Sequence, residues 1–133
     1  MATVRKTITI GRPADEVWDA VSDAGALHTR VAPHVVADCS LAAEGEERIV
    51  TFANGVVLRE LIISNDRSAR RLAWSALSDQ WQHHNASVIV TSLGENSCEV
   101  AWMADVLPHS AGALMEQFLT MGLDSMKKHM DPA

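Results

Sequence analysis

The segment HSAGALMEQFLTMGLDSMKKHM, residues 109–130, decides the fold. Its apolar residues recur at helical spacing, which predicts one long amphipathic helix. The main apolar stripe consists of Ala111, Met115, Phe118, Gly122 and Met126. That stripe is widened well beyond a narrow seam by Leu114, Leu119, Met121 and Leu123. A helix with so broad an apolar face is either largely covered by other structure or lines an internal space.

Short runs of strand-like residues, separated by turn residues, precede this helix. Apolar and polar residues alternate in most of them, so each has one face for a core. The predicted strands are residues 3–10, 35–41, 47–53, 56–63, 72–76, 83–91 and 100–104. Most of them follow one another through short turns, which predicts an antiparallel sheet.

Asn54-Gly55 lies between two of these strands and is a strong hairpin signal, because both residues tolerate positive φ. A two-residue turn there pairs Ile49 with Glu60. In that register Arg48 and Arg59 lie on the face opposite Glu60, so they cannot point inward when Glu60 does. Each face of the second strand of this hairpin, residues 56–63, carries a charged residue. The pattern therefore leaves open which face points inward.

The N-terminal part of the chain supplies two shorter helices. Gly11-Arg12-Pro13 ends the first strand, and Pro13 is suited to the start of a helix. A second short helix is expected over residues 24–31, closed by Pro33. The predicted order is therefore β-α-α, six strands and a long helix. Helices segregated from an antiparallel sheet define an α+β fold.

Length and composition limit the class of protein. The chain has 133 residues, of which 47% are hydrophobic and 21% charged, as expected for one globular domain spanning residues 1–133. Its net charge of −6, with scattered basic residues, argues against nucleic acid and anionic membranes as partners. Its N-terminus lacks the long apolar run that is typical of a signal peptide, and the sequence has no apolar run of about 18 residues. We therefore expect a cytoplasmic protein without membrane insertion.

Several segments occur in an order that resembles a known superfamily. They are PADEVW at 13–18, RIVTF at 48–52, Asn54-Gly55, Glu60, Asp66, RRLAWS at 70–75, VAW at 100–102, Asp105 and Pro108. The chain resembles the START-like superfamily, also called helix-grip or Bet v 1-like, and within it the bacterial polyketide cyclase/dehydrase (SRPBCC) proteins. The resemblance covers nearly the whole chain. It implies a curved, antiparallel, seven-stranded sheet around the long C-terminal helix.

The same resemblance implies a cavity between the sheet and that helix. Large apolar cavities with a few polar groups are the usual sites for small ligands. The candidate ligand-binding residues are Leu58, Glu60, Trp74, His84, Trp102, Met115, Phe118 and Met121. The alternative is that these side chains simply fill the core.

Glu60 and His84 are the candidate catalytic residues. A carboxylate at Glu60 held against apolar walls would be able to donate or accept a proton. Its alternative role is a salt bridge to Arg59, Arg71 or another charge at the rim. His84 shares its strand face with Val88 and therefore points inward, either as an acid or base or as a hydrogen-bonded core histidine. The chain has no Tyr, which weakens the case for cyclase chemistry.

The remaining motifs argue against metal and nucleophilic sites. His83 and His84 are adjacent on a strand, so their side chains point to opposite faces and cannot bind one ion together. The sequence has no HExxH motif, no GxSxG elbow and no glycine-rich phosphate loop. We expect no metal and no cofactor.

Three functions remain open at this point. The first is a carrier or sensor that binds a hydrophobic or aromatic small molecule, lipid-like or polyketide-like. The second is an enzyme of the cyclase/dehydratase type acting on a polyketide-like substrate, for which an inward carboxylate–imidazole pair would be the distinguishing feature. The third is a stress or toxin–antitoxin type of protein-interaction module with a filled core. The oligomeric state is open too, with a homodimer among the alternatives.

Overall fold

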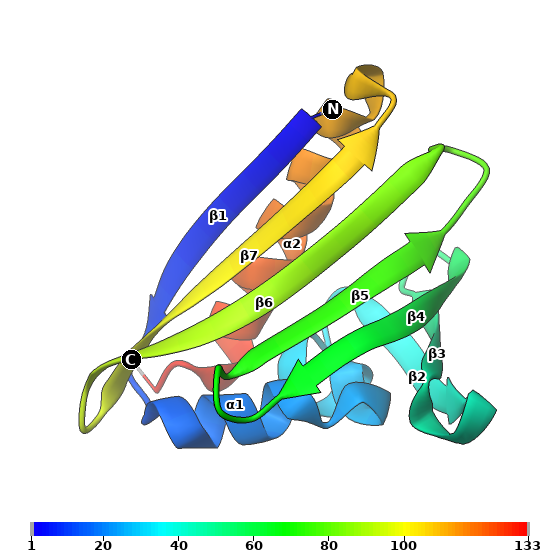
Figure 1. Ribbon diagram of the computed structural model, residues 1–133. Coiled ribbons are helices and arrows are strands. Elements are labelled where there is room, and N and C mark those ends of the chain that lie inside the picture. Colours follow the sequence, from blue (N-terminus) through cyan, green and yellow to red (C-terminus); the bar gives the residue numbers. More distant parts are fainter. Residues whose placement is uncertain (1, 133) are drawn as a thin grey trace.

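The computed structural model describes residues 2–132, and its seven-stranded antiparallel sheet curves around a long C-terminal helix (Figure 1). The strands are β1 (Ala2–Ile10), β2 (Val36–Ala42), β3 (Glu47–Phe52), β4 (Val57–Asp66), β5 (Arg71–Leu77), β6 (His83–Gly94) and β7 (Ser97–Leu107). Their order across the sheet is β1-β7-β6-β5-β4-β3-β2. The helices are α1 (Ala14–Ser22) and α2 (Gly112–Met130), and the short helical turns are η1 (Ala24–Ala26), η2 (Leu27–Val31), η3 (Ala43–Gly45) and η4 (His109–Ala111). The predicted α+β helix-grip architecture is confirmed.

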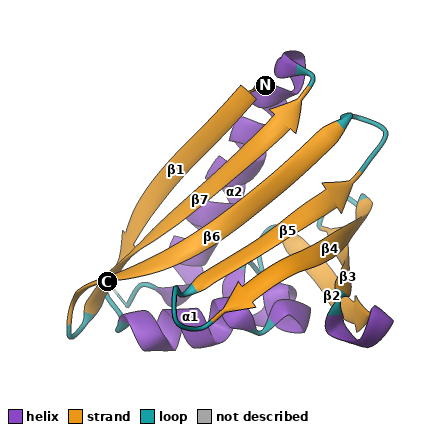
Figure 2. Ribbon diagram, in the orientation of Figure 1, coloured by secondary structure: helices purple, strands orange, loops and turns teal. Residues whose placement is uncertain are grey.

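Both helices lie on one side of the sheet, and the core lies between them and the strands (Figure 2). Helix α2 crosses the inner face and contacts β1 and β7. Helix α1 packs against β5, β6 and β7 through Val17 and Trp18, both of which are almost fully buried. Because β2 and β3 curl away from the rest of the sheet, the inner face becomes a concave surface over which α2 passes (Figure 1).

The hairpin between β3 and β4 differs from the predicted register by one residue. The N–H of Phe52 donates to the carbonyl of Val56, so the loop has three residues, and Gly55 adopts a φ of +91°. Three-residue loops of this kind place a left-handed residue at their last position. Arg48 consequently pairs with Glu60, and Ile49 pairs with Arg59. The expectation that Arg48 and Glu60 lie on opposite faces is therefore wrong.

The chain between α1 and β2 is irregular where a regular short helix was expected. Residues Ala24–Ala26 form a 3₁₀ turn (η1), and Leu27–Val31 form a single π-type turn (η2). We call residues 24–36 the strap, because they run from the end of α1 to β2 past the inner face of the sheet. At its far end, a bulge between Val36 and Asp38 turns both Val36 and Cys39 inward, which breaks the alternation predicted for residues 35–41.

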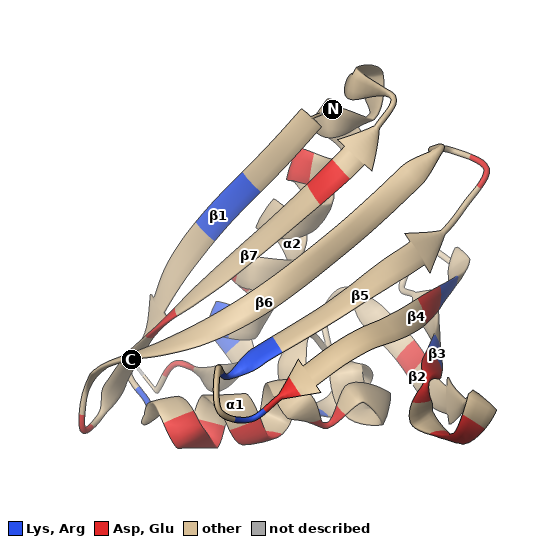
Figure 3. Ribbon diagram, viewed as in Figure 1, with Lys and Arg blue, Asp and Glu red and all other residues tan. Residues whose placement is uncertain are grey.

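Charged side chains are distributed over the outer surface. Acidic residues gather along α1, and basic residues are scattered over several elements (Figure 3). Among residues 2–132, no helix combines the length and the apolar character needed to cross a membrane.

Candidate ligand-binding cavity

A cavity of about 90 Å³ lies between the inner face of the sheet, the strap and α2. A single water needs about 10–15 Å³ of such space, so the interior is not completely filled. An engineered cavity of about 150 Å³ in another protein holds one benzene molecule, so this one suits a guest of only a few heavy atoms while its walls stay as they are. Helix α2 and the strap supply about half of the apolar wall, and the sheet supplies most of the rest.

Seven of the eight residues predicted to line the cavity do so, and Met121 does not. The seven are Leu58, Glu60, Trp74, His84, Trp102, Met115 and Phe118. Met121 is 52% exposed. At about 100° per residue, Met115, Leu119, Gly122 and Met126 form one narrow stripe, and Met121 lies well to the side of it. The apolar face of α2 is therefore broader than the part of the helix that faces the cavity.

The most polar feature of the cavity is a buried ion pair between neighbouring strands. Arg48 is 2% exposed and Glu60 is 6% exposed, and both line the cavity. The Nε–H of Arg48 donates to Oε1 of Glu60 over 2.8 Å. Glu60 is therefore inward, as one reading of its strand predicted, and its partner is Arg48 rather than Arg59 or Arg71. Arg48 is the functional candidate that the sequence missed, because the two-residue turn assigned it to the other face.

The surroundings of Arg48 hold its side chain in place. Its Nη1 donates to the carbonyl of Ala24 over 3.3 Å, and its guanidinium carbon lies 5.1 Å from the centre of the Trp74 ring. A cation over an aromatic face is attracted by the negative charge of the ring's π-system. The arginine thus links β3, β5 and the strap at one side of the cavity.

His84 is held as a neutral hydrogen-bond donor. The N–H of Ala76 donates to its Nδ1 over 3.0 Å. In a neutral imidazole one nitrogen accepts and the other carries the proton, so the proton lies on Nε2. Burial, with a smaller contribution from the charge of His83, lowers the pKa of His84 to about 4. The Trp81 ring packs over it, with ring centres 5.5 Å apart.

Trp102 lies between the sheet and α2 and also carries an unused donor. Its ring packs edge-on against Trp74, with 5.6 Å between the ring centres. Its Nε1–H is buried and, among the described residues, has no hydrogen-bond partner, as is also true of Trp18 Nε1 and His28 Nδ1. A buried donor without a partner costs about 1–3 kcal/mol.

The Trp102 ring lies directly on the backbone of α2 at Gly122. A Cβ at position 122 would contact Cζ3 of Trp102 and lie 2.7 Å from Cη2, closer than real Cβ atoms approach other atoms. Glycine at this position therefore allows the helix to sit close to the sheet.

We expect Gly122→Ala to destabilise the protein by up to about 2 kcal/mol. Overpacking costs about 1–3 kcal/mol, whereas alanine alone would improve helix propensity by about 1 kcal/mol. Urea denaturation measures the change. Combining Gly122→Ala with Trp102→Leu should cost less than the sum of the two single changes, and strict additivity would show that the Trp102 ring is not the obstacle.

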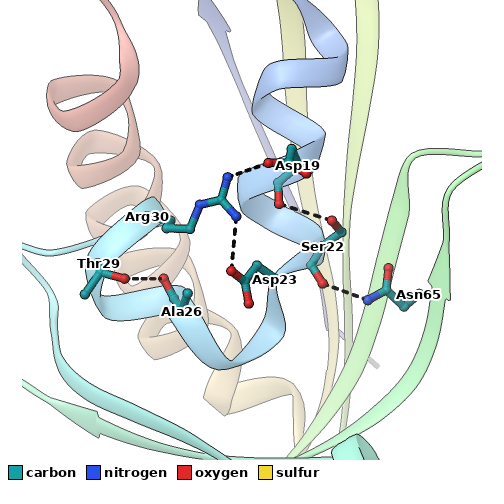
Figure 4. A network of polar contacts seen from close by, with 7 residues as sticks. All are labelled: Asp19, Ser22, Asp23, Ala26, Thr29, Arg30 and Asn65. Atoms are coloured by element: carbon teal, nitrogen blue, oxygen red, sulfur yellow. Dashed lines mark hydrogen bonds and ion pairs between the residues drawn. The ribbon is translucent and has the colours of Figure 1, made fainter.

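The strap is tied to its neighbours at several points. Arg30 donates to the carboxylates of Asp19 and Asp23 over 2.7 and 3.1 Å, which fixes η2 to the end of α1 (Figure 4). The hydrogen bond from Arg30 is the main reason that the pKa of Asp19 lies below its ordinary value. Closer to β2, the N–H of His34 donates to the buried Oγ of Ser125 on α2. These contacts tie the strap to α1 and α2.

An open groove lies beside the cavity, between the β3–β4 loop and the β5–β6 loop. Its volume is about 720 Å³, and it shares Leu58, Ala76, Trp81 and His84 with the wall of the cavity. The groove and the cavity therefore meet at these four side chains. Within residues 2–132, no three His, Cys, Asp or Glu side chains gather closely enough to hold a metal ion.

Comparisons with known proteins agree with the architecture. A family model described as polyketide cyclase/dehydrase and lipid transport matches residues 1–131. A solution structure from Thermobifida fusca is 27% identical, with a TM-score of 0.79 over 96% of this chain and 91% of that one. A START superfamily protein from Mycobacterium smegmatis is 15% identical, with a TM-score of 0.77 over 96% of each chain.

The di-domain ARO/CYC protein BexL, from the BE-7585A biosynthetic pathway, is also similar. It is 15% identical, with a TM-score of 0.80 over 97% of this chain and 46% of that one. No curated protein matches the sequence. Likenesses at these low identities show the fold, and the family model adds the class of protein.

Proposed function

The chain belongs to the polyketide cyclase/dehydrase and lipid transport family, and from that premise we propose that it binds an apolar or aromatic small molecule in its cavity, as a carrier or sensor. The family supports a ligand-binding or polyketide-related role in general.

The observation that carries the proposal is a largely apolar cavity with three buried polar side chains in its wall. Arg48, Glu60 and His84 are each less than a tenth exposed. Buried charged groups destabilise a fold unless they are well paired, and they are seldom placed beside a void by packing alone. Apolar walls with a small number of fixed polar groups are typical of ligand pockets.

The size of the cavity sets the size of the guest. About 90 Å³ is less than the space in which one benzene ring is held, so the closed state suits a guest of only a few heavy atoms. A single ring such as toluene needs a small outward movement of one wall, and a longer lipid-like or polyketide-like molecule needs a larger one. The strap is the element best suited to move, because it lacks a regular helix and its polar ties to α1 are exposed side-chain contacts (Figure 4).

We expect toluene to bind to the wild-type protein and a larger side chain at position 76 to prevent it. Ala76 is 5% exposed and lines the cavity, so Ala76→Leu fills the space that a guest would use. Titration followed through the indole N–H resonances should shift Trp74 and Trp102, which line the cavity, more than Trp18, which does not. Affinity should fall at least about tenfold in the variant, since a side chain of similar volume competes directly with the guest.

Ala37→Leu is the matched control, because Ala37 is exposed on β2 and the substitution adds the same side chain outside the cavity. It should leave toluene binding unchanged. Equal binding by Ala76→Leu, or no shift with toluene in the wild-type protein, would contradict the proposed site.

Chemistry of the cyclase/dehydratase type is the second candidate, and one observation favours it. Glu60 and His84 line the same cavity, which is the carboxylate–imidazole combination that such an enzyme needs. In that role the paired carboxylate of Glu60 would accept a proton and the Nε2–H of His84 would polarise an oxygen of the substrate. Turnover of a polyketide-like substrate by the wild-type protein, lost on removal of either side chain, would distinguish an enzyme from a carrier.

A further inference from the structure

The backbone pairing between β5 and β6 ends before the two strands do. Paired positions end at Trp74 opposite Ala86, although each strand continues for three more residues. These are residues 75–77 of β5 and 83–85 of β6, and the loop of residues 78–82 joins them (Figure 1). We call the place between these two segments the slit, because the ladder of backbone pairs between the described strands stops short of it.

Side chains replace the missing backbone hydrogen bonds at Ala76. The N–H of Val90 donates to the carbonyl of Arg70 over 2.9 Å, so every second residue of β5 from there turns its backbone groups toward β6. In a continued ladder, Ala76 would therefore exchange two backbone hydrogen bonds with His84. Instead, its N–H donates to Nδ1 of His84 over 3.0 Å, and its carbonyl accepts from Nε1 of Trp81 over 2.9 Å.

The slit is closed by two rings that are in contact with each other. The rings of Trp81 and His84 lie 5.5 Å apart between their centres, and the two residues are 9% and 6% exposed. The carbonyl of His84 is taken by the hydroxyl of Ser75, which donates to it over 2.6 Å. Because a side chain can change rotamer without separation of the strands, this closure is easier to open than a backbone ladder.

The slit lies between two hollows of the molecule. Ala76, Trp81 and His84 line the cavity and also the open groove of about 720 Å³. A smaller hollow of about 250 Å³ lies beside the strap, where Thr29 and Arg30 line it, and it shares no lining residue with the cavity. Of these two outer hollows, the groove alone borders the cavity.

We propose that guests enter and leave the cavity through the slit, and that the indole of Trp81 is its gate. When the indole swings into the groove, its hydrogen bond to Ala76 and its contact with His84 break, and the cavity opens to the groove. The groove also offers an apolar guest a surface, since Leu77 lines it and is 44% exposed. This inference rests on the proposed function, because it concerns the same cavity, and it adds the route by which the cavity is reached.

The exchange kinetics of toluene test this route in the wild-type protein and in Trp81→Ala. The association rate constant should rise at least about tenfold in the variant, because the closed state loses one hydrogen bond and one ring contact. Exchange measurements on the indole N–H resonances of Trp74 and Trp102 give the association and dissociation rate constants. A merely larger cavity would act on affinity through the dissociation rate constant and leave association unchanged.

Two control variants separate the gate from its surroundings. Leu77→Ala shortens an apolar side chain that lines the groove but not the cavity, so association should stay as in the wild type. Val90→Ala destabilises the core at the other end of β6, where Val90 is 2% exposed and lines neither hollow. It should also leave association unchanged, and an increase equal to that of Trp81→Ala would show that general loosening of the fold is the cause.

The rival route runs under the strap, and Arg30→Gln tests it. The substitution removes the ion pairs that tie the strap to Asp19 and Asp23. If guests pass through the slit, Arg30→Gln should leave the association rate constant unchanged. A faster association in Arg30→Gln, without one in Trp81→Ala, would overturn the slit as the route.

The outcomes also separate this inference from the function on which it rests. If toluene binds to the wild-type protein and Trp81→Ala leaves association unchanged, the cavity stands as the binding site and the gate is overturned. If toluene does not bind at all, both proposals fail. Should Trp81→Ala not fold, Trp81→Phe decides: it keeps a ring beside His84 but loses the donor to Ala76, so association should still rise about threefold or more.

Discussion

Replacing Arg48 with methionine should lower the free energy of unfolding by about 3–5 kcal/mol, because it leaves the Glu60 carboxylate buried without its partner. Methionine keeps much of the volume and the apolar stem of arginine, so little of the loss comes from packing. The loss combines the ion pair with the other contacts of the guanidinium, to the carbonyl of Ala24 and the ring of Trp74. Urea denaturation, followed by far-UV circular dichroism, measures the change.

The same hairpin contains a matched control on its outer face. Arg59 donates to Glu47 over 2.7 Å, across the same two strands, but its side chain is 55% exposed. Exposed ion pairs contribute little because water and salt screen them. Arg59→Met should therefore leave the unfolding curve close to that of the wild-type protein. Equal losses from Arg48→Met and Arg59→Met would show that burial does not control the strength of the Arg48–Glu60 pair.

A double variant distinguishes the effect of an unpaired buried charge from other structural roles of the Arg48–Glu60 pair. Removing both charges, in Arg48→Met with Glu60→Leu, should recover most of the stability lost in Arg48→Met, because no buried charge remains. If the double variant is as unstable as the single one, the pair has a structural role beyond charge neutralisation.

Lowering the pH from 7 to 4 should reduce the stability of the wild-type protein by up to about 3 kcal/mol through His84 alone. The pKa of His84 is about 4 in the folded protein, mainly because of burial, against 6.5 for the free side chain. Between these values the unfolded chain binds a proton at this residue and the folded protein does not. Stability is therefore complete above pH 6.5 and falls as the pH drops toward 4.

Comparison with His84→Asn isolates this effect from other titrating groups. Asparagine cannot bind the proton, so the stability of the variant should depend less on pH between 6.5 and 4, while carboxylates affect both proteins alike. His83→Asn is the control on the exposed face and should keep nearly the whole wild-type slope. Parallel pH profiles for the wild type and His84→Asn would mean that His84 is not held neutral in the folded protein.

Most of the architecture could be predicted because it depends on local patterns. Alternation over residues 83–91 correctly placed His84, Ala86, Val88 and Val90 on the inner face, since the side-chain period of a strand is fixed by its backbone. The spacing in residues 109–130 predicted the long helix in the same way. Periodicity could not give the fraction of the helix circumference that is covered, and for that reason Met121 was wrongly assigned to the cavity.

The candidate site depended on a detail that local patterns do not fix. Asn54-Gly55 is compatible with a two-residue turn or with a three-residue loop that ends at Gly55, and the two differ by one residue in register. A shift of one residue moves every side chain of one strand to the other face. Arg48 is on the inner face in one case and on the outer face in the other.

The sequence by itself determined the order of the elements, the inward direction of His84 and the presence of a long helix over the sheet, because each follows from the spacing of apolar residues along a single segment. Only the tertiary structure decided that Arg48 neutralises Glu60, that His84 carries its proton on Nε2, and that a void remains beside them. Those features depend on contacts between strands and on the packing of α2 and the strap, where a shift of one residue or one methyl group changes the outcome.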